Sequence, residues 1–279
     1  MIHIATVHWQ NDDWIDLQIC MFHKHIHNPF RTYGYLTGIT ERWYAHFDHV
    51  ITTDEADHAK KLNKLAEIIL KDAQDEDWLI FIDGDAFPID DLVTKLGPML
   101  AQAPLVAIQR LDNLGEKHAH PSFCATTVGF WKRIQGDWSR GYHWINALNS
   151  EETDVGGVLL YKLLVSNIQW IPLHRTNKVN ILPVWYGIYG DLIYHHGAGF
   201  RDRGCRRVWY EQGLFDIYRR WDARILNNIV PAKYLKRLRD STLHPEGRLK
   251  RRLNRQLNQT EEEIRARIFQ NSDFIQSLR

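Results

Sequence analysis

Two aspartates whose spacing could hold a metal ion, Asp83 and Asp85, stand directly after a short apolar run. The run is residues 78–82 (WLIFI), and its length and composition predict a central strand of a parallel sheet, buried on both faces. Because side chains alternate along an extended chain, the two carboxylates point to the same side. Gly84 between them lacks a Cβ, so a ligand or another backbone segment can approach closely.

The position of this carboxylate pair indicates what it binds. Open α/β sheets bind their ligands at the carboxyl ends of their strands, and hard oxygen ligands suit Mg²⁺ or Mn²⁺ shared with phosphate oxygens. The alternative is a polar turn that only ends the strand, since Asp-x-Asp triplets also occur by chance. The apolar strand before the pair and the Phe87-Pro88 turn after it favour the metal site.

The elements around the pair alternate between strand and helix. Strands are predicted at residues 2–7, 49–51, 78–82 and 105–109, and helices at residues 14–27, 57–71 and 90–102. This alternation predicts an α/β fold with a mostly parallel sheet flanked by helices. Farther along, strands are predicted at residues 123–131, 168–172 and 190–196, a helix at residues 154–165, and a largely helical chain from residue 215 onward.

The composition is that of a globular chain with an uneven distribution of charge. Of the 279 residues, 44% are hydrophobic and 25% are charged, and the net charge is +1. Residues 201–279 hold 19 basic and 10 acidic residues, so this segment carries +9 and residues 1–200 carry −8. A basic segment of this kind predicts either a polyanionic partner (a membrane surface, a nucleic acid or a phosphorylated acceptor) or a solvated helical face.

Cysteine usage and hydropathy predict a cytoplasmic location. Cys20, Cys124 and Cys205 are widely spaced and form no CxxC pair, which favours a reducing compartment over a disulfide framework. The first residues (MIHIATVHWQNDDW) lack the basic start and the apolar run of a signal peptide. No apolar stretch approaches the roughly 20 residues of a membrane-spanning helix.

With these motifs in this order, the sequence resembles glycosyltransferases of the GT-A fold. The resemblance covers residues 2–110 and is carried by the first strand, the helix with DHAKKLNKL, the DEDW segment and LIFIDGDAFPI. It implies a Rossmann-like catalytic domain over residues 1–214, followed by a helical, basic C-terminal region over residues 215–279. It also implies Mn²⁺ or Mg²⁺ at Asp83 and Asp85, a UDP-sugar as donor, and a glycan, a lipid-linked sugar or a protein as acceptor.

The resemblance extends to nucleotide-binding positions. In that fold the loop after the first strand contacts the base and the ribose, and Thr6, Val7 and His8 match it. A buried strand end explains Thr6 equally well. In similar proteins the helix before the motif strand carries a polar residue that reaches the nucleotide, and Asn63 and Lys64 match that place. For Lys64, a solvated helix face is an equal alternative.

Many enzymes of this family use a late histidine to complete the metal shell, and His195 and His196 match that position. Neighbouring residues on a strand face opposite sides, so only one of the two faces the metal. The family often has a glycine three residues after this histidine, and Gly199 gives His196 that spacing. The resemblance therefore favours His196, with a structural histidine pair as the alternative.

The resemblance also implies a general base. An enzyme that inverts the anomeric carbon needs a carboxylate to deprotonate the acceptor hydroxyl. In this fold that carboxylate commonly stands at a helix N-terminus, and Asp154 matches the position. Alternatively, Thr153 or Asp154 caps the helix, or in a retaining enzyme Asp154 binds sugar hydroxyls.

The C-terminal region combines basic and apolar residues. Leucines among arginines over residues 248–257 suit either a peripheral contact with anionic lipid at the inner membrane face or packing against the catalytic domain. Thr260 with Glu263 has the pattern of a capping box and predicts a helix start. The sequence has no nucleic-acid-binding motif, so no nucleic-acid partner is expected.

Two other functions compete with sugar transfer. A sugar nucleotidyltransferase normally has a Gly-rich basic loop after the first strand, where residues 8–14 here read HWQNDDW. A non-enzymatic glycan- or anion-binding module could use the eleven tryptophans or the basic C-terminal region. Such a module has no need of Asp83 and Asp85, whose position favours the transferase.

Overall fold

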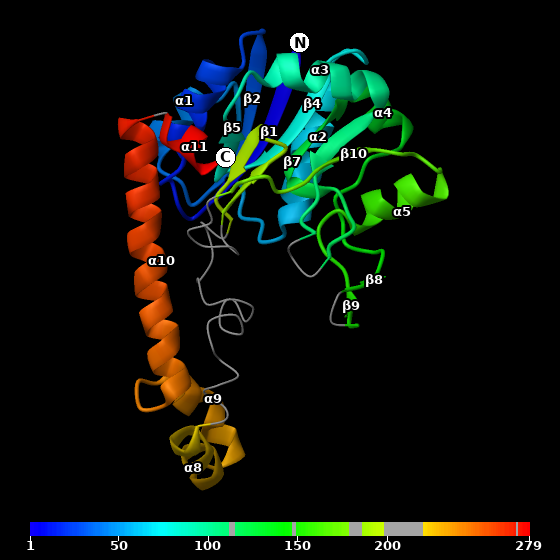
Figure 1. The fold of residues 1–279 in the computed structure, drawn as a ribbon. Helices are drawn as coiled ribbons and strands as arrows, with labels where there is room; N and C mark the ends of the chain where they lie inside the picture. The colour runs from blue at the N-terminus through cyan, green and yellow to red at the C-terminus, as the bar shows by residue number, and fades with distance from the viewer. Residues whose placement is uncertain (112–114, 147–148, 179–185, 198–219, 272) are drawn as a thin grey trace. The chain divides into compact units, whose positions relative to one another are not determined.

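The computed structural model describes residues 1–111, 115–146, 149–178, 186–197, 220–271 and 273–279 (Figure 1). The chain forms two compact units, Met1–Phe200 with Leu278–Arg279, and Arg201–Ser277. The predicted domain boundary after residue 214 falls in residues 198–219, which lie outside the described part of the chain.

The first unit is built on a seven-stranded sheet with the strand order β10-β6-β7-β4-β1-β2-β3. The strands are β1 (Ile2–Trp9), β2 (Phe30–Thr37), β3 (His49–Ile51), β4 (Trp78–Asp83), β6 (Leu105–Ile108), β7 (His120–Thr127) and β10 (Ile171–Leu173). Neighbouring strands are parallel except for β7, which is antiparallel to both β4 and β6. The prediction of an α/β fold with a mostly parallel sheet is therefore confirmed.

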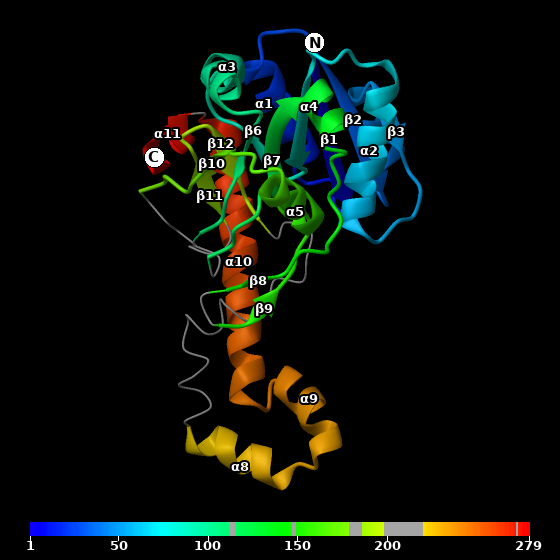
Figure 2. The same cartoon turned by 90° about the vertical axis from the view of Figure 1, so that its right-hand side faces the viewer.

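Helices cover both faces of this sheet (Figures 1 and 2). They are α1 (Ile15–His25), α2 (His58–Asp72), α3 (Leu92–Gln102), α4 (Val128–Arg133) and α5 (Gly157–Val165), with a 3-10 helix, η1 (Glu41–His46). Alternate residues of β4 belong to two separate cores. Phe81 packs with α2, α4 and α5, whereas Ile80 and Ile82 pack with α1 and α3. The apolar run is thus the doubly buried central strand that its composition predicts.

A three-stranded antiparallel sheet, in the order β11-β12-β5, continues the chain beyond β4. Its strands are β5 (Ala86–Pro88), β11 (Gly187–Tyr189) and β12 (Ile193–His195). β12 pairs with β5 so that His195 lies opposite Ala86. This small sheet therefore brings residues from late in the chain to the turn that follows β4.

Local hydrogen bonds end β7 earlier than predicted. The strand predicted over residues 123–131 begins at His120 and stops at Thr127. There the Thr127 hydroxyl accepts the main-chain N–H of Phe130, which starts α4 in place of a longer strand.

The segment before α5 is irregular. It contains a two-stranded antiparallel sheet of β8 (Trp144–Ile145) and β9 (Glu151–Glu152). The helix predicted over residues 154–165 begins only at Gly157, because its N-cap residue, Gly156, has a φ of 96°. That left-handed conformation favours glycine and turns the chain into the helix.

The second unit is helical over its described residues. It consists of α8 (Trp221–Ile229), α9 (Ala232–Asp240), α10 (Pro245–Gln270) and most of α11 (Asp273–Leu278). α10 contacts α8 and α9, and the Lys250 ammonium lies 2.8 Å from the Asp240 carboxylate and 3.1 Å from that of Glu246. α10 is continuous through Thr260, so the predicted helix start there is wrong. Among the described residues, no helix is long and apolar enough to span a bilayer.

We expect Phe81→Ala to lower the free energy of unfolding of the first unit by about 3–5 kcal/mol. The side chain is fully buried, and its ring centroid lies 4.8 Å from that of Trp131 and 5.0 Å from that of Trp138. Its removal leaves a cavity in the core shared with α4. Urea unfolding followed by tryptophan fluorescence measures the loss. Phe81→Leu, which keeps most of the apolar volume, is the matched control, and an alanine variant as stable as wild type would contradict this packing.

Candidate active site

The two aspartates occupy the turn between β4 and β5. Asp83 is the last residue of β4, and Gly84 and Asp85 connect it to the first residue of β5. Because β4 pairs in parallel with β1, Asp83 lies beside Val7, near the carboxyl end of both strands. The carboxylate pair therefore stands at the sheet edge where open α/β sheets bind ligands.

His195 lies against both aspartates. Its Nε2 is 3.6 Å from Asp83 Oδ2 and 3.5 Å from Asp85 Oδ1. Asp85 and His195 are only 2% and 5% exposed. One ligand atom from each of the three residues lies within 4.8 Å of the others. The structure thus gathers two carboxylates and one imidazole, a set of groups that can hold a divalent metal ion.

His196 has different surroundings. Its Nδ1 lies 3.0 Å from the Tyr194 hydroxyl, and its ring centroid is 4.6 Å from that of Trp14. Its main-chain N–H donates to the carbonyl oxygen of Asp85 at 3.0 Å. The structure places His195, not His196, in the group that could hold the ion, which corrects the preference for His196.

His58, the first residue of α2, is a partner of Asp83 that the sequence pattern does not reveal. Its Nε2 lies 3.1 Å from Asp83 Oδ1. Burial raises the pKa of Asp83, but the hydrogen bond and charge of His58, with the charges of His195 and Arg110, outweigh burial and lower that pKa to about 2. Asp83 is therefore ionised at neutral pH. Nothing around His58 in the sequence marks it, because the contact joins residues far apart in the chain.

Gln18 of α1 fixes the backbone of the turn and was also missed by the sequence pattern. Its Nε2 donates to the carbonyl oxygens of Asp83 and Ala86, each at 2.7 Å. Its Oε1 accepts the Thr6 hydroxyl at 3.1 Å and lies 3.0 Å from His8 Nε2. One fully buried amide therefore ties the end of β1 to both sides of the aspartate turn.

The predicted nucleotide-binding residues of β1 have buried side chains. Thr6 and His8 are 0% exposed and Val7 is 4% exposed, with Val7 packed in the core that α2 covers. Burial is the largest influence on the His8 ring and lowers its pKa to about 4, so the ring is neutral at pH 7. Thr6 and His8 support the aspartate turn through Gln18. A contact of this strand end with a nucleotide stays a prediction.

Asn63 and Lys64 make local contacts on α2. The Asn63 side chain donates to Asp137 Oδ1 at 2.7 Å and accepts the main-chain N–H of Trp138 at 2.9 Å. Lys64 lies at the surface, with its ammonium 2.9 Å from the Glu67 carboxylate. Asn63 thus fastens the chain near Trp138, Lys64 fits the solvated-face alternative, and a nucleotide contact by either residue stays a prediction.

Asp154 lies before α5 among positive groups. Its side chain is 39% exposed, with carboxylate oxygens 3.9 Å from Arg110 Nη2 and 3.8 Å from Arg140 Nη2. Its Oδ1 accepts the main-chain N–H of Val155 at 2.8 Å. The N-cap of α5 is Gly156, with no side-chain hydrogen bond, so the helix-capping alternative is wrong. An accessible carboxylate held by arginines is compatible with the general-base prediction.

Arg110, just after β6, connects these groups electrostatically. Its Nε and Nη2 each lie 2.8 Å from a Glu116 carboxylate oxygen, in a bidentate pair. Burial lowers the pKa of Arg110, but Glu116 and the other negative groups outweigh burial and raise it above its ordinary value. The permanent charge then acts on Asp83 and lies close to Asp154.

The mostly parallel sheet flanked by helices and the Asp-x-Asp turn at the end of β4 agree with the GT-A fold that the sequence resembles. No protein-family model and no curated protein matches the chain. Among solved structures, mannosyltransferase PcManGT from Pyrobaculum calidifontis, in complex with GDP-Man and Mn²⁺, is 14% identical; the match covers 50% of this chain and 47% of that one, with a TM-score of 0.37.

Two further solved structures are similar at the same level. Glucosyl-3-phosphoglycerate synthase from Mycobacterium tuberculosis, in complex with Mn²⁺, UDP and glucosyl-3-phosphoglycerate, is 14% identical, with 62% of this chain and 70% of that chain covered and a TM-score of 0.40. S. aureus TarS 1-349 is 11% identical, with 50% of each chain covered and a TM-score of 0.37. The chain spans about half the length of the TarS and PcManGT structures.

We expect Gly84→Ala to destabilise the first unit by about 1–3 kcal/mol. A Cβ at this position would lie 2.6 Å from the Val7 carbonyl oxygen and 2.5 Å from His8 Nδ1, and neither the strand backbone nor the buried ring can move away freely. Gly97→Ala in α3 is the matched control, because a Cβ there meets nothing within 4 Å. Urea unfolding compares the two variants, and equal stability would show that the turn has room for a side chain.

Proposed function

We propose that the chain is a metal-dependent glycosyltransferase that moves a sugar from a nucleoside-diphosphate donor, a UDP-sugar, to a glycan, lipid-linked or protein acceptor in the cytoplasm. The observation that carries this proposal is the gathering of Asp83, Asp85 and His195 at the carboxyl end of β4. Buried carboxylates need a balancing charge, and a divalent ion shared with a diphosphate supplies one. Peripheral membrane contact by the basic C-terminal helices has no support among the described residues.

The donor set of this site fits Mn²⁺ better than Mg²⁺. Mg²⁺ prefers oxygen ligands alone, whereas Mn²⁺ also accepts an imidazole, and His195 offers one beside Asp83 and Asp85. The low pKa of Asp83 keeps this ligand ionised at neutral pH. When bound, such an ion stabilises the negative charge that develops on the departing nucleoside diphosphate.

Residues of the chain hold this constellation in place. The Gln18 amide fixes the carbonyl oxygens on both sides of the turn, so the directions of the two carboxylates are set before a ligand arrives. Arg110 adds positive charge around Asp83, which favours an anionic donor. Preorganised charges in a buried site act more strongly than the same charges in water.

Asp154 is the proposed general base. Its carboxylate is accessible, and Arg110 and Arg140 lie within 4 Å of it and restrict its orientation. In an inverting transfer, one carboxylate oxygen accepts the proton of the acceptor hydroxyl while the hydroxyl oxygen attacks the anomeric carbon and the nucleoside diphosphate leaves. In a retaining transfer, the same carboxylate binds sugar hydroxyls instead.

We expect UDP to bind the wild-type chain only with Mn²⁺ present, and Asp83→Asn/Asp85→Asn to weaken that binding by more than about 100-fold. The amides keep the shape of the carboxylates but remove both negative charges. Calorimetric titration with UDP, with and without Mn²⁺, measures the change. Asp75→Asn is the matched control, because Asp75 is 64% exposed and pairs with Lys132 at the surface. The proposal fails if neither UDP nor GDP binds the wild type with Mn²⁺ present.

We expect Asp154→Asn to lower kcat for donor hydrolysis by about 10²–10⁴-fold and to leave KM for the donor unchanged. Without an acceptor, water takes the place of the acceptor hydroxyl and needs the same base. UDP release from the UDP-sugar selected by a donor screen gives both constants. Glu152→Gln, two residues away in β9, is the control and should keep kcat. A raised KM with kcat retained would assign Asp154 to sugar binding instead.

A further inference from the structure

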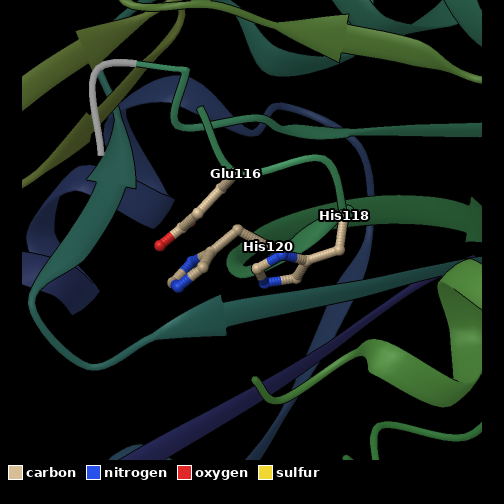
Figure 3. Close-up of side chains that lie close together, drawn as sticks. All are labelled: Glu116, His118 and His120. Atoms are coloured by element: carbon tan, nitrogen blue, oxygen red, sulfur yellow. The ribbon is translucent and has the colours of Figure 1, made fainter. Parts of the chain in front are cut away.

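A second group of metal-binding side chains lies between β6 and the start of β7. Glu116, His118 and His120 follow one another at every second position, and Figure 3 shows their side chains turned toward a common region. One ligand atom from each lies within 4.8 Å of the others. The three residues are 4%, 0% and 8% exposed, so the group belongs to the interior of the protein.

His118 is the member of this group whose environment needs a ligand. Both of its ring nitrogens are buried, and within the described part of the chain neither has a hydrogen-bond partner. The ring packs against Trp144 with 4.8 Å between centroids. Leaving a buried polar group unpaired costs about 1–3 kcal/mol, and native proteins seldom do so. Both nitrogens are shielded from solvent, and an ion bound between the side chains would give one of them a partner.

Neighbouring residues orient two of the three ligands. Arg110 holds the Glu116 carboxylate with two hydrogen bonds of 2.8 Å, which fix the direction of the carboxylate. The Ser122 hydroxyl lies 2.8 Å from His120 Nδ1, which leaves Nε2 for the metal. Metal binding at Nε2 puts the proton on Nδ1, where it is donated to that hydroxyl. The 3.1 Å contact from the Ser122 main-chain N–H to Nδ1 is then given up.

We propose that Glu116, His118 and His120 bind Zn²⁺ at a site separate from the aspartate site. Two imidazoles and one carboxylate are a common zinc ligand set, with a fourth tetrahedral position left for another oxygen donor. The nearby Arg110 charge opposes a cation, so the affinity depends on the charge of Glu116. The site fastens residues 116–120 at the start of β7. There the His120 ring centroid lies 6.2 Å from that of His195, so the zinc steadies one wall of the active site.

The test uses the full chain, stripped of metal with a chelator, and carries Asp83→Asn/Asp85→Asn to remove the neighbouring site. We expect this background to bind one equivalent of Zn²⁺ in calorimetric titration. Adding His118→Gln or Glu116→Gln should weaken that binding by at least about 10–100-fold. Co²⁺, used as a visible probe, should show the absorption of a site with fewer than six ligands and lose it in the same variants.

Two controls separate zinc binding from misfolding and from other ligands. His27→Gln changes a histidine that is 64% exposed, and it should bind Zn²⁺ as the background does. X-ray absorption of the background with one equivalent of Zn²⁺ needs no further substitution and should show nitrogen and oxygen ligands, including imidazole. The zinc proposal is overturned if the background binds no Zn²⁺, if His118→Gln binds it equally well, or if sulfur ligands appear. Since UDP binding with Mn²⁺ is measured separately, either proposal can fail without the other.

Discussion

The backbone turn at Gly84 lies so close to the end of β1 that any Cβ would meet the Val7 carbonyl oxygen at 2.6 Å. Gln18 closes the same contact from the α1 side through its bonds to the carbonyl oxygens of Asp83 and Ala86. These two contacts hold the backbone of the turn against the sheet, and the backbone in turn fixes the positions of the Asp83 and Asp85 carboxylates. The placement of the small sheet follows, since β5 begins directly after this turn and β12 adds to it. His195 reaches the aspartates through this series of contacts, which starts from a turn whose central residue, Gly84, has no side chain.

Groups from several helices, strands and loops keep the Asp83 carboxylate ionised. The Asp83 carboxylate is negative, and His58, His195 and Arg110, which come from three separate segments, lower its pKa. In a buried setting, such opposition decides which groups stay ionised. It keeps the Asp83 carboxylate charged, whereas the neighbouring His8 ring, which burial dominates, stays neutral. The site therefore contains charged ligands for an ion beside a neutral supporting layer.

Much of this arrangement could be predicted where the determinant is local. The run of residues 78–82 identifies the central strand because a five-residue apolar segment has to be buried on both faces. The position of Asp83 and Asp85 at the carboxyl end of that strand could be predicted from the same run. β2 (Phe30–Thr37) was missed because its FRTYGYLT mixes glycine and polar residues without clear alternation. The antiparallel direction of β7 depends on its pairing with β4 and β6, which no local sequence pattern predicts.

Contacts between segments that are distant in the sequence determine the parts of the site that local sequence patterns do not predict. Strand alternation correctly implies that only one of His195 and His196 faces the aspartates, but the choice depends on how β12 pairs with β5. Gln18 and His58 have no distinguishing neighbours in the sequence, and they matter because α1 and α2 begin beside the turn. Spacing of two residues places Glu116, His118 and His120 on one side of an extended segment, yet their burial appears only in the fold.

The reversal of β7 has a consequence for how this protein can diversify. Its first residues, next to Ile108 at the end of β6, lie at the edge where the parallel strands finish. A strand that enters the sheet at this edge brings the segment before it there too, so residues 115–119 reach this edge without lengthening any strand. Side-chain changes in this segment alter the wall of the site while the sheet register and the aspartate turn stay the same. The antiparallel strand thus separates a wall whose side chains can change from the aspartate turn that the core holds constant.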